Sequence, residues 1–167
     1  MAVFGLSALS LLTACEDPDT ITLEISEPVV FSVNETAVNS SGKDYDVSAW
    51  LDISQNPDVI SYINKIEEVK VIHIEYAVSN ADPQDISLNE GTIATSAGFD
   101  IIKSLPLPLS NTSSGQLTFH PPGVNDLATR LKGSGKDHLH LSGYLTRTPL
   151  ICTVTVTFHL SIKARAT

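Results

Sequence analysis

Three histidines near the C-terminus have the residue type and spacing to bind a metal ion. His138 and His140 lie two residues apart in one alternating run, and His159 lies in the next alternating run. If the two runs pair as an antiparallel hairpin with Leu145 opposite Cys152, His138 lies opposite His159. Opposed side chains have Cβ atoms about 5 Å apart, and imidazole binds Zn, Cu or Ni. The alternative is three solvated histidines on a polar strand face.

Trp50 and the acidic residues around it have the chemistry to bind a sugar. The alternation over residues 45–53 places Trp50 on the same strand face as Asp46 and Asp52. An exposed Trp flanked by hydrogen-bonding groups is how many carbohydrate-binding sandwiches hold a sugar ring. The alternative is that Trp50 lies beneath a short helix that begins at Asn56 and belongs to the hydrophobic core.

The sequence contains none of the common catalytic motifs. It has no Gly-x-Ser-x-Gly elbow, no His-Glu-x-x-His pair and no phosphate-binding glycine loop. Glu67 and Glu68 are adjacent, so on a strand they point to opposite faces and do not form a carboxylate pair. We therefore expect a protein that is not an enzyme and holds no cofactor.

Residues 1–14 are uncharged and contain an apolar run over residues 3–12. Such a run has the length of a secretory signal and is shorter than the ~20 residues that span a bilayer. Leu12-Thr13-Ala14-Cys15 follows and resembles the bacterial lipobox. The resemblance implies a signal peptide over residues 1–14, cleavage before Cys15, and lipid on the Cys15 sulfur. A signal peptide opens with Lys or Arg and this one does not, so we expect a translation start further upstream. The alternative is a hydrophobic N-terminal strand.

Acidic residues follow Cys15 directly, at Glu16, Asp17 and Asp19. They resemble the surface-export signal of Bacteroidota lipoproteins. This resemblance implies a lipid-anchored protein of the outer membrane, exposed at the cell surface, with a periplasm-facing protein as the alternative. Asp19-Thr20-Ile21 resembles the short O-glycosylation motif of the same bacteria, which implies a glycan on Thr20. Otherwise residues 15–19 form a solvated tether.

The residues that remain after removal of residues 1–14 suit one domain, over residues 20–167. The hydrophobic content of the whole chain is 42%, which is enough for a packed core. With Cys15 committed to lipid, Cys152 has no partner for an intramolecular disulfide. Because Cys152 lies in an alternating run, we expect a small buried core residue.

The net charge of −9 is unevenly distributed along the chain. Residues 15–102 contain 17 acidic and 3 basic residues, whereas residues 103–167 contain 2 acidic and 7 basic residues. We expect no nucleic-acid binding, because phosphates repel a chain of this charge. The asymmetry indicates that strands from the two parts lie side by side and offset each other's charge. The alternative is a basic C-terminal face that meets an anionic partner.

Alternation of apolar and polar residues dominates the chain after the tether. It predicts strands near residues 21–25, 29–33, 45–53, 69–78, 88–95, 99–102, 116–120, 138–145 and 152–162. Short helices are expected at residues 56–66 and 124–131, the second ended by Gly133. The apolar phase slips within residues 69–78, which indicates a bulge or burial on both faces. Residues 105–109 contain two prolines and are expected to form an extended edge segment.

Eight or nine strands with two short helices predict an all-β protein, an immunoglobulin-like β-sandwich. The last two strands are expected to pair as a long hairpin. The expected protein is thus a membrane-anchored cell-envelope lipoprotein, a non-enzymatic binding or structural component at the cell surface. Its partner would be another envelope protein or, as the alternative, a glycan held at Trp50.

Overall fold

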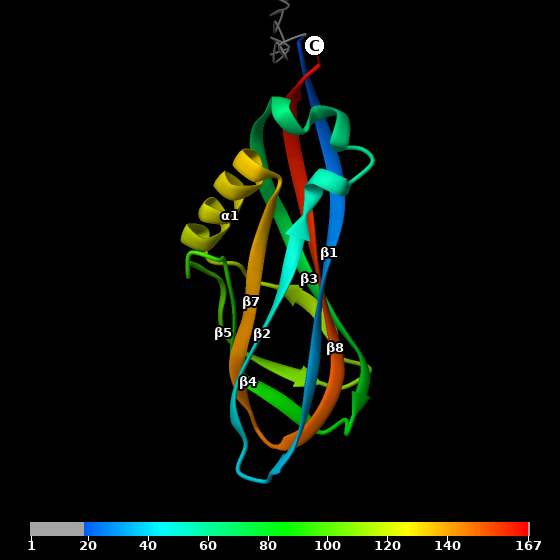
Figure 1. Ribbon diagram of the computed structural model, residues 1–167, viewed down its shortest axis with the longest axis vertical. Helices are drawn as coiled ribbons and strands as arrows, with labels where there is room; N and C mark the ends of the chain where they lie inside the picture. Colours follow the sequence, from blue (N-terminus) through cyan, green and yellow to red (C-terminus); the bar gives the residue numbers. More distant parts are fainter. Residues whose placement is uncertain (1–18, 167) are drawn as a thin grey trace, which may run out of the picture.

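The computed structural model describes residues 19–166 and contains two four-stranded antiparallel sheets that pack face to face (Figure 1). In the first sheet, the order is β1 (Thr20–Asn39), β8 (Thr148–Arg165), β3 (Ile66–Asp82) and β6 (Ser114–Leu117). In the second sheet, the order is β2 (Lys43–Asp52), β7 (Lys136–Leu145), β4 (Ile86–Ala94) and β5 (Asp100–Leu109). The prediction of an all-β sandwich is confirmed.

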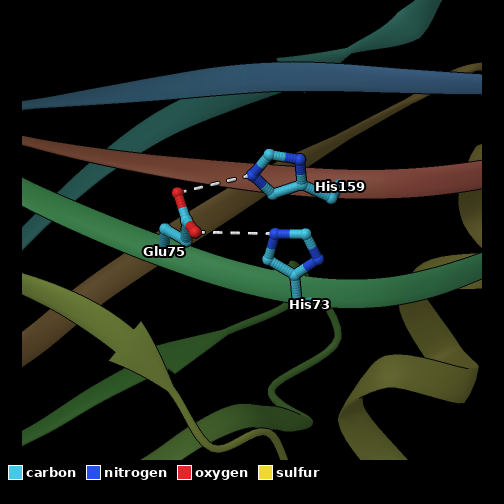
Figure 2. Close-up of side chains that lie close together, drawn as sticks. All are labelled: His73, Glu75 and His159. Atoms are coloured by element: carbon cyan, nitrogen blue, oxygen red, sulfur yellow. Dashed lines mark ion pairs between the residues drawn. The ribbon is translucent and has the colours of Figure 1, made fainter.

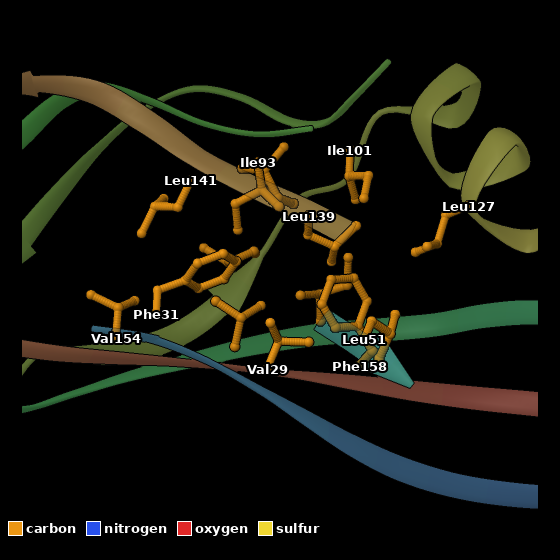
Figure 3. Close-up of a cluster of buried hydrophobic side chains, with 14 of the residues drawn as sticks. Val29, Phe31, Leu51, Ile93, Ile101, Leu127, Leu139, Leu141, Val154 and Phe158 are labelled. Atoms are coloured by element: carbon orange, nitrogen blue, oxygen red, sulfur yellow. The ribbon is translucent and has the colours of Figure 1, made fainter. Parts of the chain in front are cut away.

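The core lies between the sheets and is built from the apolar face of each strand. In β8, every second residue from Leu150 to Ile162 is buried. Figure 3 shows side chains of both sheets meeting in this core, among them Val29, Phe31, Val154, Phe158, Leu51, Ile93, Leu139 and Leu141. Burial of one such side chain contributes about 1.5–3 kcal/mol. Successive side chains of a strand point to opposite faces, so apolar residues at every second position lie on one face. Burial of that face in the core is what turns it inward.

Consecutive strands alternate between the sheets except for β4 and β5, which pair in the second sheet, and this connectivity is that of a jelly roll. In both sheet orders, β1-β8-β3-β6 and β2-β7-β4-β5, strands from the first half of the chain alternate with strands from the second half. An immunoglobulin domain instead has strands ABED facing CFG. The expected all-β sandwich is confirmed, and its strand order, which the sequence does not give, differs from the immunoglobulin order. Eight short strands in two Greek keys define the jelly roll.

The predicted hairpin between the last two strands was wrong. β7 lies in the second sheet beside β2 and β4, and β8 lies in the first sheet between β1 and β3. The two strands are joined by Thr146 and Arg147, which carry the chain from one layer to the other. Two strands that each have one apolar face can bury that face by packing against each other from opposite sheets. They can also bury it on a common core when they pair side by side in one sheet. The apolar pattern is the same in both arrangements.

β1 and β3 each show how the chain adapts to its place in the sheet. β1 continues through Pro28, which merges two predicted strands into one. This proline is tolerated because β1 is an edge strand and lacks a neighbour on one side.

In β3, the register shifts between Val71 and His73, and Ile72 is exposed. The predicted bulge is confirmed there. Residues 105–109 lie in edge strand β5, which confirms the predicted edge position.

Three helical segments complete the described chain: η1 (Ile53–Gln55), η2 (Ile60–Lys65) and α1 (Pro121–Ser134). The predicted first helix is shorter than expected, because Asn56 accepts a hydrogen bond from the Asp58 amide in a turn before η2. The second helix does not stop at Gly133. Gly135 ends it in the left-handed conformation, with φ of 72°, and donates its amide to Leu131.

The described ends of the chain lie together at one end of the elongated domain (Figure 1). Thr20 is opposite Arg165, and the Ala166 amide donates to the Asp19 carbonyl at 2.8 Å. The β1–β2, β3–β4, β5–β6 and β7–β8 connections lie at the opposite end, since the strands that enter and leave them run antiparallel. A tether at residue 19 would therefore leave these four loops furthest from its attachment point.

Candidate functional site

Trp50 lies on the outer face of the second sheet with 57% of its surface exposed. It precedes Leu51, which is fully buried, so the strand alternation turns the indole outward. Its partner on β7 is His138. The expectation that Trp50 projects with the acidic residues is confirmed, and the alternative of a core position beneath a helix is wrong.

An aromatic and charged cluster surrounds this indole. The His138 ring lies 4.7 Å from the Trp50 ring, centroid to centroid, at an interplanar angle of 37°. His140 follows at 5.5 Å from His138 in an edge-on arrangement, and the Lys136 Nζ lies 5.4 Å from the Trp50 ring centroid. The Nδ1 of His140 lies 3.3 Å from an Asp46 carboxylate oxygen. We refer to these five residues as the aromatic platform.

The two acidic residues predicted beside Trp50 have different roles. Asp46 is exposed and its only described partner is His140, so its carboxylate can accept further hydrogen bonds. Asp52 instead caps η1: its Oδ1 accepts the Ser54 amide at 2.9 Å and the Ser54 hydroxyl at 2.5 Å. Asp52 therefore stabilises the end of β2, and Asp46 is the better candidate for a ligand contact.

A surface depression of about 420 Å³ continues the aromatic platform towards the β1–β2 loop. Asp44, Asp46, Glu90 and Tyr144 line it together with Ser142. Asp46 belongs to both the platform and the depression. Because a strand rises about 3.3 Å per residue, Trp50 and Asp46 lie about 13 Å apart along β2. The face thus offers an aromatic surface at one end and acidic acceptors at the other.

The three histidines predicted to share one patch do not lie together. His138 and His140 are neighbours on β7, on the outer face of the second sheet. His159 is on β8, on the outer face of the first sheet, with the core between them. The prediction was wrong because it depended on the β7–β8 hairpin, which the fold does not contain.

His159 has different partners, which the sequence prediction missed. It lies beside His73 of β3, with Glu75 two residues further along that strand (Figure 2). The spacing His73-x-Glu75 was a usable signal, because residues two apart on a strand share a face. The pairing of β3 with β8 was not visible in the sequence, so the third member of this cluster could not be assigned.

A polar cluster with a structural role joins α1 to the second sheet. Asp137 is buried and accepts the Ser96 hydroxyl at 2.6 Å, and Arg130 donates to the same hydroxyl at 3.0 Å. Arg130 also donates to Asp126 at 2.7 Å. Burial acts to raise the pKa of Asp126, but hydrogen bonds from Arg130 and Thr95 outweigh it and hold this pKa below its ordinary value. The side chains of these residues hydrogen-bond to one another, and these bonds hold α1 against the second sheet.

The remaining predicted residues lie near or beyond the described N-terminus. Thr20 is the first residue of β1 and is half-buried opposite Arg165. Cys15, the signal peptide over residues 1–14 and the acidic residues 16 and 17 lie outside the described residues. Within residues 19–166, no helix combines the length and the apolar character needed to cross a membrane.

The chemistry of the aromatic platform suits a ligand with apolar faces and many hydroxyl groups. The indole of Trp50 can stack against an apolar face, while its own N–H remains a donor. Asp46 accepts hydrogen bonds, Lys136 donates them, and His140 can do either. Such a mixture of one aromatic surface and a few polar groups is typical of small-ligand sites.

No protein-family model and no curated protein matches the chain. Among solved structures, it is similar to turnip yellow mosaic virus, with 12% identity, 88% of this chain and 96% of that chain covered, and a TM-score of 0.42. It is similar to Desmodium yellow mottle tymovirus at 11% identity, with 100% and 93% covered and a TM-score of 0.38. It is also similar to a decameric BFDV capsid protein at 10% identity, with 86% and 98% covered and a TM-score of 0.42. These likenesses carry no functional conclusion, and the jelly-roll assignment rests on the strand order alone.

Proposed function

We propose that the chain is a lipid-anchored protein of the cell envelope, without enzymatic activity, whose jelly-roll domain binds a glycan on the aromatic platform. The anchor is proposed from the lipobox-like residues that end at Cys15. The glycan is proposed from one observation, the exposed indole of Trp50 among hydrogen-bonding side chains. Jelly rolls serve in lectins, capsids and cupins, so the fold does not choose among these functions.

The balance of groups on the aromatic platform supports a glycan over an apolar ligand. An indole with 57% of its surface in water gains free energy when a ligand covers it. The platform has charged groups beside the indole, and these would lose hydration against a purely apolar ligand. A sugar ring avoids that loss, because its hydroxyl groups replace the water around Asp46 and Lys136. The depression next to Asp46 offers space for a second sugar unit.

A protein partner has weaker support in the described part of the chain. The other strongly exposed apolar side chains there lie on β1, η2, β3, β8 and the β4–β5 loop, at Val30, Val38, Ile60, Ile72, Phe99 and Ile151. Single exposed apolar residues are normal on a protein surface. The aromatic platform instead brings three rings into contact on one face. For this reason we place the ligand contact there.

Glycan binding is tested with the full chain, extracted in mild detergent and applied to an array of envelope and host glycans. The hit is then titrated by calorimetry against the native chain and Trp50→Ala. We expect at least tenfold weaker binding in Trp50→Ala, because loss of the indole removes about 1.4 kcal/mol or more of contact. Ile151→Ala is the matched control, since Ile151 is also exposed but lies on β8, in the other sheet.

Three results bear on the proposal in different ways. Weakening in Trp50→Ala with Ile151→Ala unchanged supports glycan binding on the platform. Equal binding by Trp50→Ala and the native chain would show that the glycan binds elsewhere on the protein, which contradicts the proposed site. No glycan hit, together with a specific protein captured from the native membrane in a Trp50-dependent manner, would replace the glycan with a protein partner.

A further inference from the structure

Three potential metal ligands lie side by side on the outer face of the first sheet. His159 is on β8, His73 is its partner on the neighbouring strand β3, and Glu75 follows His73 by two residues. The bulge at Ile72 makes this arrangement, since it reverses the phase of β3 between Val71, which is buried, and His73, which faces outward. Bulges redirect single side chains in this manner and are frequent beside functional sites.

The distances between these groups fit a shared metal ion better than hydrogen bonds. The Nε2 of His73 lies 3.5 Å from one Glu75 carboxylate oxygen, and the Nε2 of His159 lies 3.6 Å from the other (Figure 2). Hydrogen bonds between nitrogen and oxygen are shorter, about 2.7–3.2 Å. Ligands on a tetrahedral Zn²⁺, each about 2.0–2.1 Å from the ion, lie about 3.3–3.5 Å from each other. The three donor atoms lie within 4.8 Å of one another.

His159 is oriented as a ligand by its second ring nitrogen. Its Nδ1 lies 2.8 Å from the hydroxyl oxygen of Ser26 on β1. When Nδ1 donates to this oxygen, the lone pair of the neutral ring is on Nε2 and is directed towards Glu75. Metal-binding histidines are held by such a bond from their other nitrogen. Ser26 therefore acts as a positioning residue for His159.

The Nε2 of His159 is shielded from solvent and has no hydrogen-bond partner among the described residues. A buried polar atom without a partner costs about 1–3 kcal/mol. A metal ion beside it would satisfy that atom. The ring of His73 stacks on the ring of His159 with centroids 3.7 Å apart and an interplanar angle of 11°. This stacking keeps a donor nitrogen of His73 close to the Nε2 of His159.

We propose that His73, His159 and Glu75 bind one divalent transition-metal ion, with Zn²⁺ as the first choice. Two imidazoles and a carboxylate are ligands that Zn²⁺ takes in open sites, where water fills the remaining position. A depression of about 300 Å³ beside His73 and His159, also lined by Glu24 and Ile72, has room for that water. Binding turns the His73 ring out of its parallel stack on His159, which Ser26 holds in place, because in-plane lone pairs of parallel rings do not meet at one point.

The ion would join the two strands that carry its ligands. Metal binding to the folded state raises the free energy of unfolding by RT ln(1 + [metal]/Kd). A rise in the melting temperature with added Zn²⁺ is therefore expected along with binding heat. This inference does not depend on the aromatic platform, which lies on the opposite face of the molecule.

The test uses the full chain, purified in mild detergent without a polyhistidine tag and stripped of metal with a chelator. Zn²⁺ is titrated by calorimetry, and melting curves are recorded with and without it. We expect one ion per chain and a higher melting temperature. His159→Ala and His73→Ala should each weaken binding at least tenfold, and Glu75→Gln should weaken it measurably. Ser26→Ala should weaken it about tenfold, as expected for the loss of an orienting bond.

The matched control is the double variant His138→Ala, His140→Ala, which removes the neighbouring histidine pair on the opposite sheet. It should bind Zn²⁺ as the native chain does. Far-UV circular dichroism without metal checks that each variant folds. The proposal is overturned if the folded native chain takes up no Zn²⁺, if uptake survives both His73→Ala and His159→Ala, or if the control variant abolishes it.

Discussion

Trp50 and Leu51 are adjacent in the chain, yet one indole lies mostly in solvent and the next side chain is fully buried. Strand alternation accounts for both, and it could be seen in the sequence. Ile72 shows the opposite case. It is a large apolar residue that lies exposed because the strand bulges there. A single extra residue in β3 thus decides that His73 faces His159 instead of the core.

The buried environment of Cys152 changes the chemistry of its thiol. Cys152 is free and buried, and burial raises the pKa of its thiol from the ordinary value of 9.0 to about 11. The prediction of a small buried core residue is confirmed. Since the thiolate is the reactive form, Cys152 in the folded protein should resist alkylation at pH 8.

A pH dependence of stability follows from this raised pKa. Well below pH 9 the thiol keeps its proton in both the folded and the unfolded state and contributes no slope. Between pH 9 and about 11 the unfolded chain loses the proton and the folded chain keeps it, so the free energy of unfolding falls as the pH rises. Urea unfolding at pH 8, 9, 10 and 11 should show a steeper fall for the native chain than for Cys152→Ala, by at most about 1.4 kcal/mol per pH unit. Equal slopes for the two proteins would contradict it.

At the scale of elements, α1 is held against the second sheet by a close backbone approach. Gly123 of α1 is buried, and a Cβ added there would lie 2.0 Å from the carbonyl oxygen of Asp100 at the start of β5. The amide of His120, just before the helix, donates to Ile101 at 2.7 Å. A side chain at position 123 therefore has no space unless the helix moves away from β5.

This contact predicts opposite effects for two glycines of one helix. Gly123→Ala should lower the free energy of unfolding by about 1–3 kcal/mol, since the clash exceeds the gain in helix propensity. Gly133→Ala is the matched control, because an added Cβ there has no atom within 4 Å. It should raise stability by about 0.5–1 kcal/mol. Chemical denaturation measures both, and a stabilising Gly123→Ala would show that α1 does not pack as described.

At the scale of the whole molecule, the interleaved sheets account for the uneven charge of the sequence. Arg165 of β8 donates to Glu67 of β3 at 2.7 Å, and Arg147 pairs with Asp85. Both pairs join the basic C-terminal part to the acidic N-terminal part. The expectation that the two parts offset each other's charge is confirmed at these pairs.

The proposed lipid anchor at Cys15 makes a prediction about how the chain is attached to the membrane. If Cys15 is lipidated, Cys15→Ser should lack the mass of the lipid and retain residues 1–14, because cleavage before residue 15 follows lipidation. Cys152→Ala is the matched control and should carry the lipid and lack residues 1–14, because Cys152 lies in the core. Detergent phase partition and mass spectrometry of the full chain measure both. A native chain with a free thiol at Cys15 and residues 1–14 still attached would exclude the lipid anchor.

The sequence by itself determined most of the strands, the two-layer sandwich and the face of β2 that carries Trp50 and the acidic residues. Each of these depends on the local alternation of apolar and polar residues, which reports the face that is buried. The sequence did not determine which strands are neighbours. β8 has the same alternating pattern whether it pairs with β7 or packs against it, so the pattern fits both arrangements.

The tertiary structure alone decided the jelly-roll order, and with it the composition of each surface cluster. It separated His159 from His138 and His140 and placed it beside His73 and Glu75. The physical reason is that pairing depends on how all eight strands of the described chain fill a common core. Side chains from residues 73 and 159 become neighbours only after that core has set the strand order.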